Sequence, residues 1–218
     1  AVWDFTDDDS RESYVSGDIV EEGMWMGFVG QQLPCAAMMI RHGVKRGNAS
    51  IKQKGVDIVD FWADNSMTVH GFPRTRWKVS PPAGWRTDPI KIRTVCEGME
   101  GMLHAWRILD RQGEFHPAWI QACLTFGDWL VSEQNADGSY YREYSVFTGN
   151  ATHTGKQISN IPVRFLCRLY DVTRDVRFLN AALAAGEYSY AIEYETGTYI
   201  GGVADNPNVR DRSACLIS

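Results

Sequence analysis

The 218 residues carry a formal net charge of −5, and 44% of them are hydrophobic; these values exclude a disordered, collagen-like or coiled-coil chain. The longest apolar runs fall far short of the ~20 residues that a membrane span needs, and an acidic chain without a long basic run is a poor match for nucleic acid, so we expect neither partner. Eight Trp, nine Tyr and nine Phe indicate either a large core or an aromatic binding surface.

The first part of the chain divides into an irregular segment and two helices. Residues 1–23 form the irregular N-terminal segment. The apolar stretch 24–42 predicts the first helix, kinked or divided at Pro34. A break at Gly47 and Asn48 follows, and apolar residues at helical spacing then predict a second helix over 51–64.

Two more helix pairs follow, and the start of the first is marked clearly. Asp88 and Pro89 have the form of an N-cap followed by a proline in the first helical turn, and the helix is expected to run to about residue 110. His116 and Pro117 open its partner, which continues through residue 133. A third pair and three long loops complete the pattern, the helices at 156–172 and 175–194 and the loops at 66–89, 135–154 and 195–211.

A short phrase recurs near the end of the second helix of each pair, where an acid precedes an aromatic residue. It begins at Asp60 and returns at Asp128 and Glu187, 68 and then 59 residues later. Self-similarity at a roughly fixed period is typical of a repeat architecture. We therefore predict helical hairpins arranged around an axis, with all long loops at one end, where a binding site can form. The three acids themselves are expected on solvated faces of outer helices.

Three phrases resemble the six-hairpin glycosidase-like superfamily, whose fold is an (α/α)6 barrel. Residues 166–175 and 178–182 look like its inner helix, short turn and outer helix. Residues 133–139, Glu-Gln-Asn-Ala-Asp-Gly-Ser, are similar to the phrase that closes an outer helix there, and 201–207 resemble its glycine-rich loop. The resemblance covers about residues 24–218 and implies an all-α fold and a carbohydrate-active enzyme.

The length departs from that family. Six hairpins of ~60 residues require about 350 to 400 residues, whereas this chain supplies three and the opening of a fourth. An open half-barrel would expose large apolar helix faces, which soluble monomers avoid. We therefore expect residues 24–218 to form about half of an (α/α)6 toroid that a missing segment or a second chain completes.

The resemblance favours a glycoside hydrolase, which works through a pair of carboxylates on either side of the scissile bond. Glu97 and Glu100 qualify, because they stand at i and i+3 on one predicted helix and so share a face. Gly and Met residues around them suggest an apolar setting, which would raise the pKa of an acid catalyst. The alternative is a pair of structural carboxylates that bind Arg93 or Arg107. His153, in the second long loop, is a further candidate acid or base.

The first long loop concentrates cations and aromatic residues. Between residues 70 and 93 there are six Lys or Arg and one acid, with Phe72, Trp77 and Trp85 among them. Trp faces stack on sugar rings and Arg pairs with carboxylates, so the loop could bind an anionic sugar such as a uronate. The alternative is a solvated basic loop that forms ion pairs with neighbouring loops. The predicted substrate-binding residues are Trp25, Arg74, Arg76, Trp77, Trp85, Arg93, Tyr140, Tyr141, Arg142 and Asp205.

Two other functions remain open. A polysaccharide lyase acting on a uronic-acid polymer would use His153, Tyr140 or Tyr141 as base, with arginines to neutralise the acid. A non-catalytic sugar-binding toroid would need no such group. We expect no metal and no cofactor; the smallest spacing between cysteines is 27 residues, so the chain has no CxxC metal or redox motif. Five cysteines, expected as buried free thiols, favour a reducing compartment, whereas two glycosylation sequons at Asn48 and Asn150 favour a secretory route.

Overall fold

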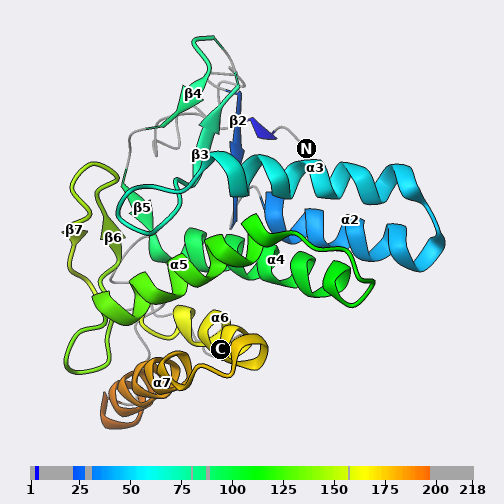
Figure 1. Cartoon of the computed structure of the whole chain (residues 1–218). Coiled ribbons are helices and arrows are strands. Elements are labelled where there is room, and N and C mark those ends of the chain that lie inside the picture. The colour runs from blue at the N-terminus through cyan, green and yellow to red at the C-terminus, as the bar shows by residue number, and fades with distance from the viewer. Residues whose placement is uncertain are drawn as a thin grey trace.

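Six helices dominate the part of the chain that the computed structural model describes, residues 3–4, 22–27, 31–79, 81–86, 89–156 and 158–196. They form three antiparallel hairpins, each closed by a short turn, as the sequence predicts (Figure 1). The helices are α2 (Gln32–Arg46), α3 (Ala49–Asn65), α4 (Ile92–Asp110), α5 (Pro117–Glu133), α6 (Ile161–Thr173) and α7 (Val176–Thr196).

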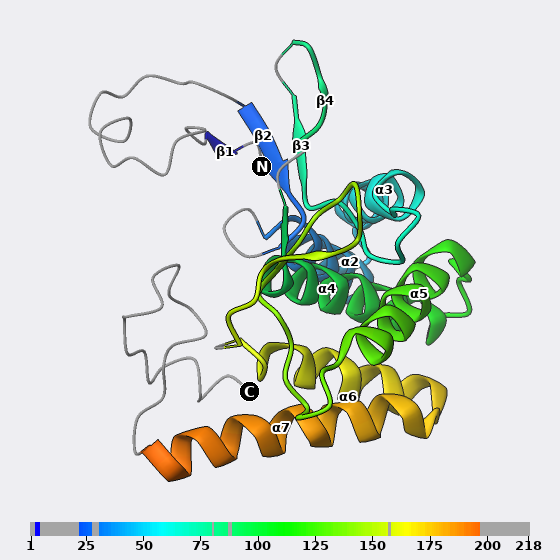
Figure 2. The same ribbon diagram turned by 90° about the vertical axis from the view of Figure 1, so that its left-hand side faces the viewer.

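The hairpins are arranged in two layers. Helices α2, α4 and α6 pack against one another in sequence and form an inner layer, while α3, α5 and α7 form an outer layer in the same order. Figure 2 shows the three hairpins following one another along an arc. This arrangement confirms the predicted all-α partial toroid.

Two small antiparallel sheets lie in the long connections ahead of the inner helices. One has the order β1-β2-β3-β4 and the other β5-β6-β7, so that loops of different hairpins pair with each other. The long loops therefore gather at one end of the toroid and the short turns at the other (Figure 1). The strands are β1 (Trp3–Asp4), β2 (Glu22–Trp25), β3 (Arg76–Lys78), β4 (Gly84–Trp85), β5 (Ile90–Lys91), β6 (Glu143–Tyr144) and β7 (Ala151–His153).

Three inner helices begin later than predicted, because the chain ahead of them is extended or turned. Helix α2 starts at Gln32, and the predicted helical residues 24 and 25 belong to β2. Pro34 lies in the first turn of α2, where its missing N–H breaks no helical hydrogen bond. Helix α4 starts at Ile92 rather than Pro89, since β5 pairs with β6; the proposed cap Asp88 lies outside the described residues. Helix α6 starts at Ile161, not at residue 156.

The break between α2 and α3 follows from the chemistry of two residues. Gly47 has φ +64°, the left-handed conformation that terminates a helix without steric cost to glycine. Asn48 then caps α3, since its side-chain oxygen accepts a hydrogen bond of 3.0 Å from the Ile51 N–H.

Two of the repeated acids connect neighbouring outer helices. The Asp60 carboxylate on α3 accepts a hydrogen bond of 2.7 Å from the Trp119 indole on α5. Asp128 Oδ1 on α5 lies 3.1 Å from Arg177 Nη1 on α7. Their side chains are about half exposed, in agreement with the expected positions on the outer helices. The repeat in the sequence thus marks a repeated contact between hairpins.

Much of the aromatic content packs between the layers. Trp62, Trp119, Phe126 and Phe165 are fully or almost fully buried, and Phe126 and Phe165 lie with ring centroids 5.2 Å apart. Part of the aromatic excess is therefore explained by packing in a large core. Among the described cysteines, Cys35 is exposed, which corrects the expectation that all the thiols are buried.

Candidate functional site

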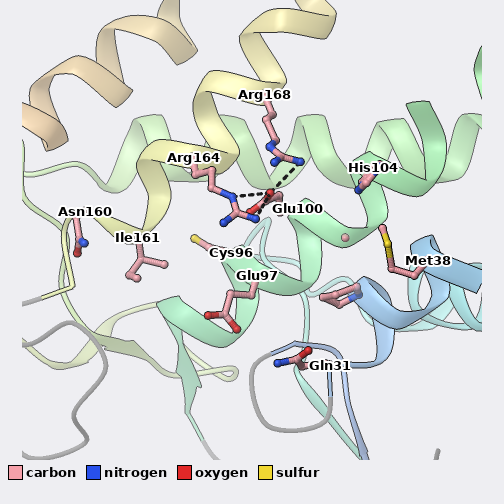
Figure 3. A pocket seen from close by; sticks show the side chains of 12 residues that line it. Gln31, Met38, Cys96, Glu97, Glu100, His104, Asn160, Ile161, Arg164 and Arg168 are labelled. Carbon is pink, nitrogen blue, oxygen red and sulfur yellow. Dashed lines mark hydrogen bonds and ion pairs between the residues drawn. The ribbon is translucent and has the colours of Figure 1, made fainter. Parts of the chain in front are cut away.

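The inner helices line a cavity of about 430 Å³ on the concave side of the arc, which we call the inner-face cavity (Figure 3). All three inner helices contribute to its wall, together with residues just ahead of α2 and α6. The lining is mixed, with carboxylates, arginines and a histidine beside apolar groups. The lining residues are Gln31, Pro34, Met38, Cys96, Glu97, Glu100, Gly101, His104, Asn160, Ile161, Arg164 and Arg168.

Glu100 is the most strongly bound carboxylate of this cavity. Arg164 places Nε and Nη2 each 2.7 Å from Glu100 Oε1, and Arg168 Nη1 lies 3.0 Å from the same oxygen. The Glu100 side chain is 12% exposed, whereas the two arginines remain 46% and 36% exposed. Glu100 is therefore a paired anion, and the exposed parts of both arginines face the cavity with donors to spare.

Glu97 lies one turn earlier on α4 and is more accessible. Its side chain lies on the cavity wall (Figure 3) and is 39% exposed. Its carboxylate lies 3.7 Å from Arg93 Nε. The sequence suggested an apolar setting for both glutamates, but their surroundings differ from that expectation. Glu97 has Arg93, one of the two partners foreseen in the alternative, and Glu100 has two arginines of α6.

His104 was not predicted as a site residue, and it lies one turn beyond Glu100 on the same face of α4. Its pKa is lowered, first by burial and then by the positive charges of Arg168 and Arg41, with Glu100 acting in the opposite direction. A neutral imidazole has one nitrogen that donates and one that accepts, so it can exchange a proton with a bound molecule.

The Cys96 thiol also lines the cavity, but it is poorly suited to nucleophilic attack. Burial raises its pKa well above the ordinary value, and the nearby Glu97 and Glu100 raise it further. Because the thiolate is the reactive form, Cys96 is an inert wall residue at neutral pH.

The three tryptophans predicted to bind substrate, Trp25, Trp77 and Trp85, lie together in the first sheet and do not line the cavity. Trp77 on β3 and Trp85 on β4 meet edge to face, with centroids 5.1 Å apart, and both contact Phe61 of α3. Arg76 is buried, and its guanidinium carbon lies 4.6 Å from the centroid of the Trp25 ring.

Two predicted arginines of the first loop lie in different places. Arg74 lies just ahead of β3, where its backbone N–H donates to the carbonyl of Ser66. Arg93 is in the first turn of α4 and approaches the cavity through its contact with Glu97. Of the first-loop cations expected to bind substrate, Arg93 is therefore the one next to the inner-face cavity.

The site residues predicted in the second loop lie in different places. Tyr140 is fully buried, and burial raises the pKa of its phenol. Arg142 is buried, and its Nε lies 3.8 Å from a carboxylate oxygen of Glu143. The Tyr141 ring centroid lies 6.0 Å from Lys156 Nζ. His153 is exposed on β7 and accepts a hydrogen bond from the Gly155 N–H. None of these four lines the inner-face cavity. Asp205 lies outside the described residues.

The sequence carried a signal for the residues that were missed. Positions 97, 100, 104 and 107 of α4, and 111 directly after it, recur every three or four residues and are all charged or histidine, which is a polar stripe along one helix face. On α6, Arg164 and Arg168 stand at i and i+4 in the same way. Whether such a stripe faces solvent or the axis of a toroid depends on the neighbouring helices, so the sequence alone left it open.

The described residues contain no group of three or more His, Cys, Asp or Glu side chains that could hold a metal ion. Across those same ranges, no helix has the length and apolar character of a membrane span.

Comparisons with solved structures identify the fold. No family model and no curated protein matches the sequence. The chain is similar to a GH76 α-mannanase from Bacteroides thetaiotaomicron (TM-score 0.54, 14% identity, 78% of this chain and 45% of that one). It is also similar to the cellobiose 2-epimerase of Bacillus thermoamylovorans (0.60, 12%, 76% and 41%) and to a D-mannose isomerase (0.59, 13%, 82% and 44%). All three have the six-hairpin (α/α)6 fold, so the chain has the fold that its sequence resembles. It spans less than half the length of each.

Proposed function

We propose that the chain forms part of a carbohydrate-processing enzyme and that the sugar binds in the inner-face cavity. The observation that carries the proposal is the convergence of two carboxylates, two arginines and a neutral imidazole on one concave wall. Binding sites are typically concave, with a few polar groups that fix the ligand. The three solved structures with this fold are named as a mannanase, an epimerase and an isomerase, which gives the proposal a consistent substrate class.

The geometry suggests different roles for the two glutamates. Glu100 and its arginines form a rigid group that can hold sugar hydroxyls, since both guanidinium groups retain exposed donors. Glu97 is the more exposed of the two, with 39% of its side chain accessible against 12% for Glu100. It is therefore the better candidate for proton transfer to a glycosidic oxygen.

The leading reaction in this proposal remains glycoside hydrolysis. A hydrolase needs carboxylates roughly 5 to 9.5 Å apart on opposite sides of the scissile bond. Glu97 and Glu100 project from one helix, and Glu100 is occupied by two arginines, so the pair expected from the sequence is better replaced by Glu97 and a carboxylate from outside the described residues. The three inner helices described here form one wall of the cavity, and we infer that a further segment or a second chain supplies the opposite wall and completes the ring.

Isomerisation or epimerisation of a sugar is the second candidate, because of one observation. His104 has a lowered pKa and lies on the cavity wall, where a neutral imidazole can take a proton from carbon next to a carbonyl. The lyase alternative has less support, since its candidate bases Tyr140, Tyr141 and His153 are not among the lining residues. Recognition of a uronate would fall to Arg164 and Arg168 rather than to the first loop.

The test is to assay Glu97→Gln and His104→Gln on three kinds of substrate. With mannan and cellobiose, the assay measures the release of new reducing ends. With mannose, it measures aldose–ketose interconversion. With a uronic-acid polymer, it measures the ultraviolet absorbance of an unsaturated product. A hydrolase predicts loss of reducing-end release in Glu97→Gln with sugar binding retained. An isomerase predicts that His104→Gln loses interconversion. Glu114→Gln, on the turn after α4 and outside the cavity, is the matched control. Full activity of both cavity variants on every active substrate would refute the assignment.

A further inference from the structure

A second cavity of about 420 Å³ lies farther along the same two inner helices, away from the long loops. It is lined by the C-terminal halves of α4 and α6 and is separate from the first cavity except for two shared residues, His104 and Arg168. Its lining residues are Leu103, His104, Arg107, Ile108, Arg111, Arg168 and Asp171.

The charge of this lining is strongly one-sided. Three arginines face one acid, and Asp171 forms no ion pair with any of them within the described residues. Arg107 and Arg111 have no acidic partner in the described part of the chain, in contrast to Arg164 and Arg168, which share Glu100. A concave site with unneutralised guanidinium groups concentrates anions.

The surroundings of His104 show the same excess of positive charge. The charged groups that act on it come from all three inner helices: Arg168 on α6, Arg41 on α2, and Arg107 and Glu100 on α4. Three of these four are cations that lower its pKa. An anion bound among them would offset their effect, because it would favour the protonated imidazole.

Arginines in the last turns of a helix also stabilise the helix dipole, which is the simplest structural role for Arg107 and Arg111. That role requires only contact with the C-terminal end of α4. It does not explain why Arg168 of a second helix faces the same cavity, nor why cations of three helices converge on His104.

We propose that the second cavity is an oxyanion site that binds a phosphate or carboxylate group through Arg107, Arg111 and Arg168, with His104 at its border to the first cavity. Guanidinium groups bind both kinds of anion through paired N–H donors. Because the two cavities share His104 and Arg168, an anion held here lies next to whatever occupies the first cavity. The proposal does not depend on the reaction assigned to that cavity.

The experiment is an NMR pH titration of the His104 ring, assigned with His104→Gln, in the presence of increasing inorganic phosphate or acetate. The expected result is a saturable shift of the His104 signals and a rise of its pKa with at least one of the two anions. A saturable shift with only one of the two anions would show whether the site binds phosphate or carboxylate groups. The absence of a saturable shift with either anion in the unchanged protein would overturn the proposal.

The matched variants separate the site from general electrostatics. Arg107→Gln with Arg111→Gln should weaken binding by roughly tenfold or more, since charge-assisted hydrogen bonds are lost. Arg46→Gln removes the charge of an exposed arginine at the end of α2, outside both cavities, and should bind as the unchanged protein does. Equal binding in all three proteins would also overturn the proposal. Neither readout uses turnover, so the result is independent of the proposed enzymatic function.

Discussion

Arg164 contacts Glu100 through two nitrogens, Nε and Nη2, each 2.7 Å from the same carboxylate oxygen. The contact joins α6 to α4 across the inner layer, 64 residues apart in the sequence. Arg168 adds a third nitrogen at 3.0 Å. One carboxylate thus fixes two arginines of the neighbouring hairpin on the cavity wall.

The first prediction concerns the stability that this cluster supplies. Glu100→Gln should lower the free energy of unfolding by about 1 kcal/mol, a value discounted because both arginines are partly exposed. Chemical denaturation at neutral pH measures the change. Glu114→Gln removes the carboxylate of the more exposed pair with Lys52 and should change the free energy by less than about 0.5 kcal/mol. Equal losses in the two variants would mean that the arginine cluster contributes no special stability.

The second prediction concerns the effect of pH on stability through His104. Its pKa is lower in the folded protein than the ordinary value, because of burial and of Arg168, Arg41 and Arg107. The unfolded chain therefore binds a proton more readily, and stability should fall as the pH decreases below about 6.5. Between about pH 7 and about pH 5, His104→Gln should lose less stability than the unchanged protein. Parallel curves for the two proteins would contradict the lowered pKa.

The third prediction compares two helical glycines. A Cβ at Gly101 would lie 2.5 Å from the backbone nitrogen of Pro34, where α4 packs against α2 beside the cavity. A Cβ at Gly186 on α7 would meet nothing within 4 Å. Gly101→Ala should therefore destabilise the protein, whereas Gly186→Ala should stabilise it by up to about 1 kcal/mol through helix propensity. Thermal unfolding of both variants gives the signs; stabilisation by Gly101→Ala would mean that the helices do not pack as closely as described.

The fourth prediction concerns an ion pair in the second loop. Hydrogen bonds from Lys156 and Ser139 lower the pKa of Asp137 to about 2. The stabilisation that this carboxylate provides is present above its ordinary pKa of about 4 and is lost as the pH falls toward the folded value. Titration of the Asp137 carboxyl carbon by NMR should give a midpoint near 2, and Lys156→Met should raise it. A midpoint near 4 in the unchanged protein would exclude the pair in solution.

The repeat was predictable because its marks recur in the sequence itself. Gly47 and Asn48 end one helix and begin the next through their own backbone and side-chain preferences. The acids Asp60 and Asp128 recur because each outer helix contacts the next in the same way. Such features are visible in a single sequence.

The helix starts and the cavity were harder to predict, because they depend on segments far apart in the chain. Ile90 pairs with Tyr144 in a strand, so α4 begins after the predicted cap. Arg164 and His104 share a cavity wall only because α6 and α4 are neighbours around the arc. A polar stripe on a helix gives no indication of which helix it faces, and the sequence therefore favoured the aromatic loop, where Trp77 and Trp85 largely pack against Phe61.

The most direct test of the proposed sugar site is a crystal structure of Glu97→Gln soaked with mannose or cellobiose. The account predicts sugar density in the inner-face cavity, with hydroxyl groups in hydrogen-bond contact with Arg164 or Arg168. Sugar bound instead on the surface formed by Trp77 and Trp85, with the inner-face cavity empty, would contradict it.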